Sequence, residues 1–464
     1  MSVVSRDPCV EAYESNQELP VIVAIAAVVI VAVLSYVEPR IGLAAILLGY
    51  AFLPFVVGAV RVGPISLHVC TMMTLTMLAV WTVVPARHMP SSKPELFPFI
   101  PAGTMLVLAV FVAGVAVTEL VVTKTPATAL SFFLNYIVAP IGLFVLCCDA
   151  ASRYDGFSRV VALGVVAVAC VQSLLALMIS LGLLQQPFES RYQRQFWWGV
   201  ISRADRQLGI TDHPLNLALL IAAAIPLVAI IRRGWVQVLA VVIMFAGVAL
   251  TQSRIGLVAA VVGLLYLVLV GSGSGRRRLT TGIGVVIGFA VLTYFDVFGR
   301  IVERIGNDNG SSEVRNDAWE NLVPMWRKFF PFGIGIDNLK PFMKSHFGSN
   351  SSPESALLGY AVGFGIPLAL LFFGVLLWLA INRIRHDRTI NPAVASLLIV
   401  LVAIQFFSSI TTGISSTSII LWLCTFLAVT YRSPGPVVES ELPEGQTADT
   451  RASEVGASEV GVAR

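Results

Sequence analysis

Residues 213–271 have the sequence HPLNLALLIAAAIPLVAIIRRGWVQVLAVVIMFAGVALTQSRIGLVAAVVGLLYLVLVG. The charged side chains of this stretch are Arg232, Arg233 and Arg254. They divide it into three apolar runs, at about 213–231, 235–252 and 255–271. The hydrocarbon core of a bilayer needs roughly 20 apolar residues per helix. The stretch therefore predicts three consecutive transmembrane helices.

The whole chain has the same character. Of its 464 residues, 56% are hydrophobic and only 12% are charged, about half the charged fraction of an ordinary soluble domain. This composition excludes a soluble protein and a disordered body. Further apolar runs bring the candidate spans to thirteen, with the remaining ten at about 19–37, 41–60, 63–85, 98–122, 127–148, 159–184, 279–298, 355–381, 391–410 and 413–431. We predict an all-α, polytopic transmembrane helix bundle of about 12–13 spans.

The basic residues predict how the bundle is oriented. Arginines follow the seventh, ninth, eleventh and thirteenth candidate spans, at Arg232/Arg233, Arg276–Arg278, Arg383/Arg385/Arg388 and Arg432. Basic residues favour the cytoplasmic side of a membrane, so odd-numbered spans should end there and the C-terminus should be cytoplasmic. Three connections then lie on the outer face: residues 185–212, the turn Thr251–Arg254, and a large extracytoplasmic loop at about 299–354.

Charge and composition also divide the chain into parts. An N-terminal tail (1–18) and a C-terminal tail (432–464) each carry a net charge of −3. Because the net charge of the whole chain is +4, the body (19–431) carries +10. The C-terminal tail is rich in Ser, Glu, Gly and Ala and is predicted to be a disordered cytoplasmic tail. The basic excess of the body lies beside its spans and does not indicate a nucleic-acid partner. The six cysteines show no metal-binding spacing.

The large loop alternates charged residues with apolar patches. Its aromatic residues favour short amphipathic helices that lie at the lipid headgroups; they are Trp319, Trp326, Phe329, Phe330 and Phe332. A connection of this length is usually functional or disordered. We expect the chemistry of the protein on this face.

Arginine is the most prominent polar residue of the predicted outer face. Arg191, Arg194, Arg203 and Arg206 lie in the first loop, and Arg254 follows in a turn too short to leave the membrane surface. A guanidinium group stays protonated and binds phosphate oxygens through two parallel hydrogen bonds. The pattern indicates a bound anion, although arginines of this kind can also extend toward lipid headgroups without a specific ligand.

Three segments carry a family resemblance. Residues 203–218 have the sequence RADRQLGITDHPLNLA, residues 250–254 have LTQSR, and the loop and the helix after it contain Arg315–Trp319, Pro331–Asn338 and Ala356–Gly365. In this order, these segments resemble the O-antigen ligase and Wzy-type polysaccharide polymerase superfamily. The resemblance covers about residues 200–375 and departs from the pattern at Leu215, which separates Pro214 from Asn216.

The resemblance implies a glycosyltransferase. It implies transfer of a glycan from a polyprenyl-diphosphate-linked donor to a hydroxyl group of a glycan or lipid acceptor. The reaction would occur at the outer face of the cytoplasmic (inner) membrane, with inversion and without a metal or another cofactor. Both polymerases and ligases of surface polysaccharides use this donor chemistry, and the motifs do not separate them.

The resemblance also suggests site residues. Arg254 with Arg203 or Arg206, and Arg315 more weakly, would hold the diphosphate. Family members commonly carry a His-Asn pair where this chain has Ser352-Pro353. The remaining candidates for activating the acceptor are Glu354 and His346. Each also has a purely structural interpretation, for Glu354 as a helix-capping carboxylate.

Two other classes of membrane protein would have a similar composition. The main alternative is a multi-span transporter or a flippase of lipid-linked sugars, and the other is a non-catalytic anchoring subunit. Transporters usually show paired halves and substrate groups near the middle of the membrane. In this chain one loop dominates and the polar residues gather at one face, which favours the enzyme.

Overall fold

The computed structural model places most of the body of the chain. It describes residues 21–83, 99–195, 198–203, 206–271, 282–284, 286–288, 290, 293, 299, 318–348, 353–406, 410 and 416–432. The predictions for the two tails, for most of the tenth span and for Arg315 lie outside the described residues.

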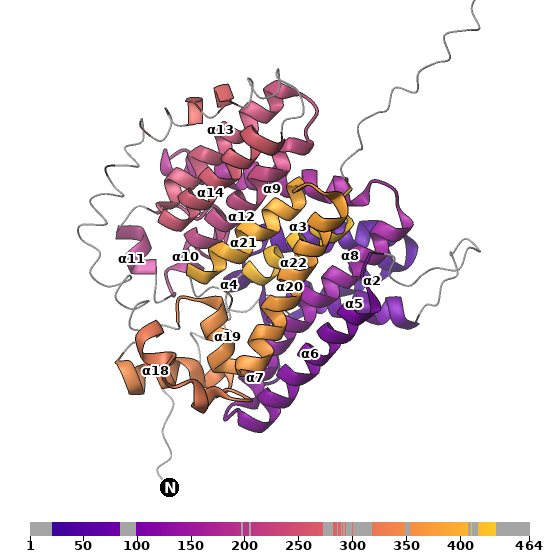
Figure 1. Ribbon diagram of the computed structural model, residues 1–464, viewed down its shortest axis with the longest axis vertical. Coiled ribbons are helices and arrows are strands. Elements are labelled where there is room, and N and C mark those ends of the chain that lie inside the picture. The colour runs from indigo at the N-terminus through magenta and orange to yellow at the C-terminus, as the bar shows by residue number, and fades with distance from the viewer. Residues whose placement is uncertain are drawn as a thin grey trace, which may run out of the picture. The chain divides into compact units, whose positions relative to one another are not determined.

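The described part of the chain is almost entirely helical (Figure 1). Five helices are long and apolar enough to cross a membrane: α6 (Ala102–Val122), the continuous pair α7 (Pro126–Phe132) and α8 (Ala139–Arg153), α9 (Phe157–Ser180), α13 (Gly234–Thr251) and α20 (Ile366–Asp387). Seven shorter apolar helices accompany them: α2 (Val21–Val37), α3 (Pro39–Phe52), α5 (Val69–Val83), α12 (Pro214–Leu227), α14 (Arg254–Tyr266), α21 (Pro392–Ala403) and α22 (Thr417–Thr430). Among the described residues, these helices coincide with twelve of the thirteen predicted spans.

Short elements connect or extend these helices. They are α4 (Phe55–Gly58), β1 (Ala59–Val62), β2 (Ile65–His68), α10 (Glu189–Tyr192), α11 (Trp198–Arg203), α18 (Leu339–Phe347) and α19 (Ala356–Phe364). Short 3₁₀ turns occupy Val228–Ile230, Trp326–Phe329, Ile336–Asn338 and Ile404–Phe406. Wider π turns occupy Phe133–Val138 and Leu267–Gly271. The first π turn lies just before Pro140, a residue that has no N–H and disturbs the preceding helical turn.

Helix α12 lies at the centre of the bundle. It packs against α9, α13, α14 and α21, and every side chain from Asn216 to Ala218 and from Ile221 to Leu227 is buried. Outer helices instead expose large apolar side chains, such as Leu106 and Leu120 of α6. A helix that is apolar on all sides is typical of a membrane protein. The N-terminus of α12 therefore brings its preceding loop to the middle of one end of the bundle.

One group of connections forms what we call the loop face. Hydrogen bonds join connections that are distant in sequence: Asp212 accepts from Val56 N (3.4 Å), Leu250 O accepts from Gln207 N (2.9 Å), and Asp337 accepts from Thr125 Oγ1 (2.6 Å). Among the described residues, the loop face thus comprises the connections at 53–68, 123–126, 181–195, 198–203, 206–213, 251–254, 318–348, 353–355 and 416–417. The group includes the three connections predicted to be external, and the alternation of the predicted spans puts the other connections on the same side.

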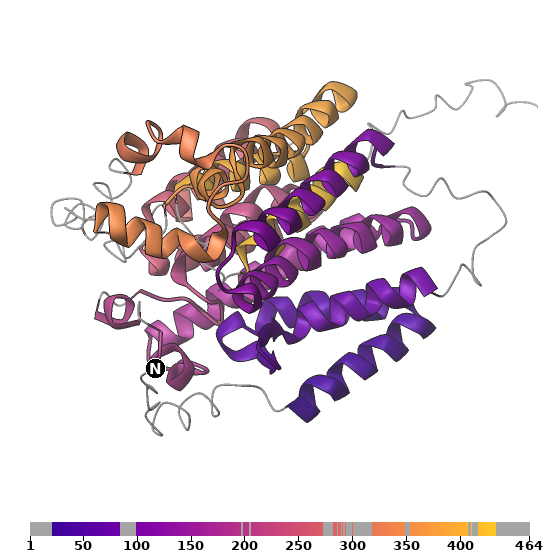
Figure 2. The same cartoon turned by 90° about the horizontal axis from the view of Figure 1, so that it is seen from below.

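The other helix ends form what we call the basic face. Tyr154 Oη donates to Glu38 (3.0 Å), Arg383 Nη2 donates to Tyr431 O (3.0 Å), and Tyr266 Oη donates to Ile390 O (2.9 Å). Each contact again joins segments that the topology predicts on one side. Figure 2 shows residues 318–347 in orange at one end of the long helices and the start of α6 at the other.

The second and third predicted spans, at 41–60 and 63–85, were wrong in their limits. Helix α3 ends at Phe52, before Pro54, and residues 59–68 form a hairpin in which Val62 pairs with Ile65. Gly63 has φ of 62°, the conformation that a tight hairpin turn requires at this position. The side chain of Asn135 forms hydrogen bonds with the backbone at the edge of the hairpin. It accepts from His68 N (3.0 Å) and donates to Ser66 O (2.9 Å).

The eleventh predicted span, 355–381, is divided at Gly365. This residue has φ of 101° and separates α19 from α20. The carbonyl groups freed at the end of α19 accept from the large loop: Val362 O from Ile334 N and Gly363 O from Gly335 N, both at 2.9 Å. The Gly333–Gly335 segment therefore closes the loop onto a helix end, and its amides donate to backbone carbonyl groups.

The close approach at Gly365 gives a test of this arrangement. A Cβ atom there would overlap the Pro331 carbonyl oxygen, and the φ of 101° is strained for any other residue. We expect Gly365→Ala to destabilise the protein by at least ~2 kcal/mol, measured as a lower unfolding midpoint in detergent. The control is Gly374→Ala in α20, where a Cβ meets open space. An equal midpoint for the two variants would contradict the contact.

Candidate functional site

The C-terminus of α13 is the structural centre of the site. The last four carbonyl groups of a helix have no partner within the helix, and here each has one. Thr251 Oγ1 donates to Val248 O (2.8 Å) and Gln252 N to Ala249 O (3.1 Å). From the distant first loop, Gln207 N donates to Leu250 O (2.9 Å) and Arg206 Nε to Thr251 O (3.0 Å).

These bonds bring two of the predicted arginines to one place. The half-buried Arg206 lies against the turn that carries Arg254, across 45 residues of sequence. Its charge at a helix C-terminus is favourable, because that end of the helix dipole is negative. Arg206 therefore has a structural role at the site, whatever else it binds.

Arg254 occupies the opposite electrostatic environment. It is the first residue of α14, after the N-cap Ser253, whose Oγ accepts from Gly256 N (3.1 Å). A cation at the positive end of a helix is unfavourable, by typically 0.3–1 kcal/mol. The helix N-terminus and the guanidinium group together create a concentrated positive potential. Such a potential is the usual setting for a bound anion.

The loop before α12 is anchored by a buried carboxyl group. Asp212 is 2% exposed and accepts from Val56 N at 3.4 Å. Burial raises the pKa of this carboxyl to about 7, although backbone N–H groups oppose the shift. The neighbouring His213 caps α12, its Nδ1 accepting from Leu215 N (3.2 Å). Together these residues fix the chain between Arg206 and the centre of the bundle.

The first loop carries further guanidinium groups. Burial and the nearby charge of Arg194 lower the pKa of Arg191. Tyr192, between them, is fully buried, stacks on Trp198 and donates to Thr211 O (3.1 Å). The backbone of Arg203 ends α11, which places this residue in the same loop as Arg206.

The two candidates for activating the acceptor differ in their surroundings. His346 is exposed on α18, its ring stacked on Phe342 with centroids 4.1 Å apart. Its Nδ1 lies 3.1 Å from Phe342 O. Glu354 is half-buried between Pro353 and Ser355, both buried. Ser355 is the N-cap of α19, its Oγ accepting from Leu358 N.

The large loop contains an amphipathic helix, α18, which follows the aromatic residues on which the prediction of such helices rested. Leu339 and Met343 of this helix are buried, whereas Lys340 and Lys344 are exposed. Residues 318–322 are also helical, and Leu322 is buried there while Trp319 is exposed. The described part of the loop is thus folded against the bundle through one apolar side.

Sequence inspection missed the residues that hold this loop in place. The buried Glu119, near the end of α6, accepts from Ile336 N (3.0 Å). Asp337 accepts from Thr123 Oγ1 (2.7 Å) and from Thr125 Oγ1 (2.6 Å). These bonds outweigh the effect of burial and lower the pKa of Asp337. The available signal was an acidic residue at the end of an otherwise apolar span.

No metal centre emerges from the part of the chain that is described. Within it, no three side chains of His, Cys, Asp or Glu come together as ligands. The described free cysteines are Cys70, Cys147, Cys148, Cys170 and Cys424, of which all but Cys170 are buried.

One known family model matches part of this chain. Residues 239–373 match the family model described as O-antigen ligase. This segment is O-antigen ligase-like. The matched region runs from α13 through the Arg254 turn and the large loop into α20, and it confirms the predicted resemblance there. The 203–218 segment lies outside the match. Searches of curated proteins and of solved structures found no match.

The O-antigen ligase match indicates a general class of activity. It indicates a glycosyl-transfer enzyme of the ligase or polymerase type, lipid-linked glycans as substrates and a membrane setting. The apolar helices agree with a multi-pass membrane protein. The matched region contains Arg254, and Arg206 is hydrogen-bonded to that region from outside it.

Asp212 provides a test of how the site is held together. Its native pKa of about 7 lies above its ordinary value of 3.8, so the native state holds this proton more tightly than the unfolded state. Stability should fall as pH rises from about 4 to 7, on the order of 4 kcal/mol in all, and the loss should persist above pH 7. Asp212→Asn should remove this part of the pH dependence.

The measurement is the unfolding midpoint in detergent at pH 5 and pH 8. The control is Asp155→Asn, which removes one carboxylate at an exposed position. If Asp212→Asn keeps the full difference between the two pH values, ionisation of a buried Asp212 does not contribute to it.

Proposed function

We propose that this protein transfers a glycan from a polyprenyl-diphosphate carrier to a hydroxyl group of a glycan or lipid acceptor. The reaction takes place on the loop face, at the outer side of the cytoplasmic membrane, and the C-terminus is cytoplasmic. The observation that carries the proposal is the position of Arg254 at the N-terminus of α14, with Arg206 hydrogen-bonded to the preceding turn.

The electrostatics of this position suit a diphosphate. A diphosphate leaving group develops negative charge as its bond to the sugar breaks, and positioned guanidinium groups stabilise that charge best in a partly dry site. Arg254 is half-buried, and the end of α14 adds its own positive potential. We assign the diphosphate to Arg254 and Arg206, with Arg203 and Arg315 as further contacts.

The acceptor hydroxyl needs a group that takes its proton as it attacks the anomeric carbon. Direct displacement at this carbon inverts its configuration. Glu354 is the preferred base, because buried neighbours on both sides and the N-cap at Ser355 fix its backbone. His346 is the second candidate; its exposed ring has Nδ1 turned toward its own helix. A well-placed base contributes roughly 10²–10⁴ in rate.

The role of Arg254 can be tested by a conservative substitution. Arg254→Lys keeps the charge but removes the planar pair of donors. We expect the rate of glycan transfer in purified membranes to fall by about 10²–10³. Arg233→Lys, an exposed substitution on the basic face, is the matched control. Unchanged transfer by Arg254→Lys, at equal protein levels, would remove this residue from the site.

The base can be identified by comparing two variants. Glu354→Gln preserves size and should lower transfer by about 10²-fold or more, while His346→Ala should retain most of the activity. In Glu354→Gln, the rate of transfer should no longer fall as the pH is lowered, because the base whose protonation causes that fall is absent. The opposite pattern would assign the proton transfer to His346, and full activity in both variants would exclude both residues.

A further inference from the structure

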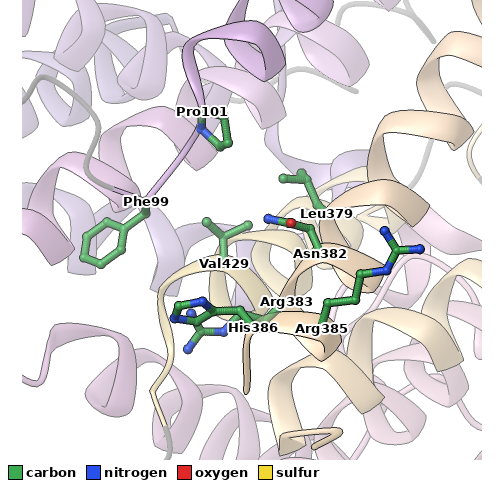
Figure 3. A pocket seen from close by; sticks show the side chains of 8 residues that line it. All are labelled: Phe99, Pro101, Leu379, Asn382, Arg383, Arg385, His386 and Val429. Carbon is green, nitrogen blue, oxygen red and sulfur yellow. The ribbon is translucent and has the colours of Figure 1, made fainter. Parts of the chain in front are cut away.

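A second polar site lies on the basic face, away from the diphosphate site. A cavity of about 340 Å³ opens between the segment at the start of α6 and the last turns of α20 and α22. Figure 3 shows the residues that line it: Phe99, Pro101, Leu379, Asn382, Arg383, Arg385, His386 and Val429. Its volume is within the range of small-molecule sites.

The lining of this cavity has an apolar part and a polar part. Phe99, Pro101, Leu379 and Val429 form an apolar part, and Asn382, Arg383, Arg385 and His386 provide hydrogen-bond donors. None of the described residues that line the cavity is acidic. A ligand that fits both parts has an anionic head and an apolar body.

Among the described residues, the carboxylate of Asp387 pairs with one of these cations and leaves the others. Asp387 forms an ion pair with Arg383 Nε (3.0 Å) and accepts from Asn391 Nδ2 (3.0 Å). Arg383 also donates to Tyr431 O (3.0 Å), which ties the end of α20 to the end of α22. Arg383 therefore builds the wall of the cavity, whereas Arg385 is exposed at its edge.

We infer that this cavity binds one phosphate-bearing anionic ligand, and that the ligand is the headgroup of an acidic phospholipid. Arg385, His386 and Asn382 contact the phosphate, and the first carbons of the lipid lie against Phe99 and Leu379. Basic pockets between transmembrane helices are suited to acidic headgroups. The site is independent of glycan transfer, because it lies at the opposite end of α20 from Gly365.

The experiment measures lipid binding to the full-length protein in detergent by native mass spectrometry. Phosphatidylglycerol should bind at least tenfold more tightly than phosphatidylcholine. Arg385→Gln should weaken phosphatidylglycerol binding by roughly tenfold, the usual effect of losing one charge-assisted hydrogen bond. Arg388→Gln, an exposed substitution at the same helix end that does not line the cavity, should leave binding unchanged.

Two further arms separate the remaining outcomes. Asn382→Trp fills the cavity from an exposed position and should also abolish binding, which tests the cavity itself. Inorganic phosphate should not displace the lipid at millimolar concentration; displacement would mean that the site takes free phosphate, which overturns the lipid assignment. Equal binding of both lipids, or equal binding by Arg385→Gln and Arg388→Gln, would also overturn the inference.

Discussion

The site depends on carbonyl groups that a helix leaves unsatisfied where it ends near lipid. Within a bilayer such groups have no water to bond, and each unsatisfied one costs several kcal/mol. Helix α13 meets this constraint with donors from the first loop, Gln207 N and Arg206 Nε. The same bonds that complete the helix also bring Arg206 to the turn before Arg254. The hydrogen bonds that satisfy the backbone at the end of α13 are therefore the same ones that bring the arginines together.

The end of α19 also leaves carbonyl groups that need donors from elsewhere in the chain. Gly365 interrupts the helix, and the large loop provides Ile334 N and Gly335 N to the freed carbonyls. Glu119 and Asp337 then tie that loop to α6. The described part of the loop is thereby fixed next to the helix that follows Glu354. This arrangement gives the acceptor side of the proposed reaction a rigid support.

Composition alone predicted most of the helices, because a lipid environment makes apolar length a direct signal. The predicted limits of these helices were wrong where a local backbone preference interrupts an apolar run. This happens at Pro54 and Gly63 in one region and at Gly365 in another. The membrane side of each loop is a prediction from the arginines next to the spans. The contacts across each face agree with that grouping of segments.

The detail of the site could not be predicted in this way. The motifs indicated which arginines belong together, and the structure adds that Arg206 reaches its partner through a carbonyl group, Thr251 O. Nothing in the sequence near Asp212 reveals that it is buried against residues 55 and 56, because that contact depends on tertiary packing across 156 positions. The basic cavity likewise forms from three helix ends, none of which is distinctive by itself.

The central claim is that the Arg254 turn and the large loop share one side of the membrane while the basic cavity lies on the other. It is tested most directly by single cysteines at Gln252, Ser345 and Arg388 in a variant without the native cysteines, labelled in intact cells with a membrane-impermeant maleimide. The account predicts labelling at positions 252 and 345, and labelling at 388 only after permeabilisation. Labelling of 252 and 345 from opposite sides would contradict it.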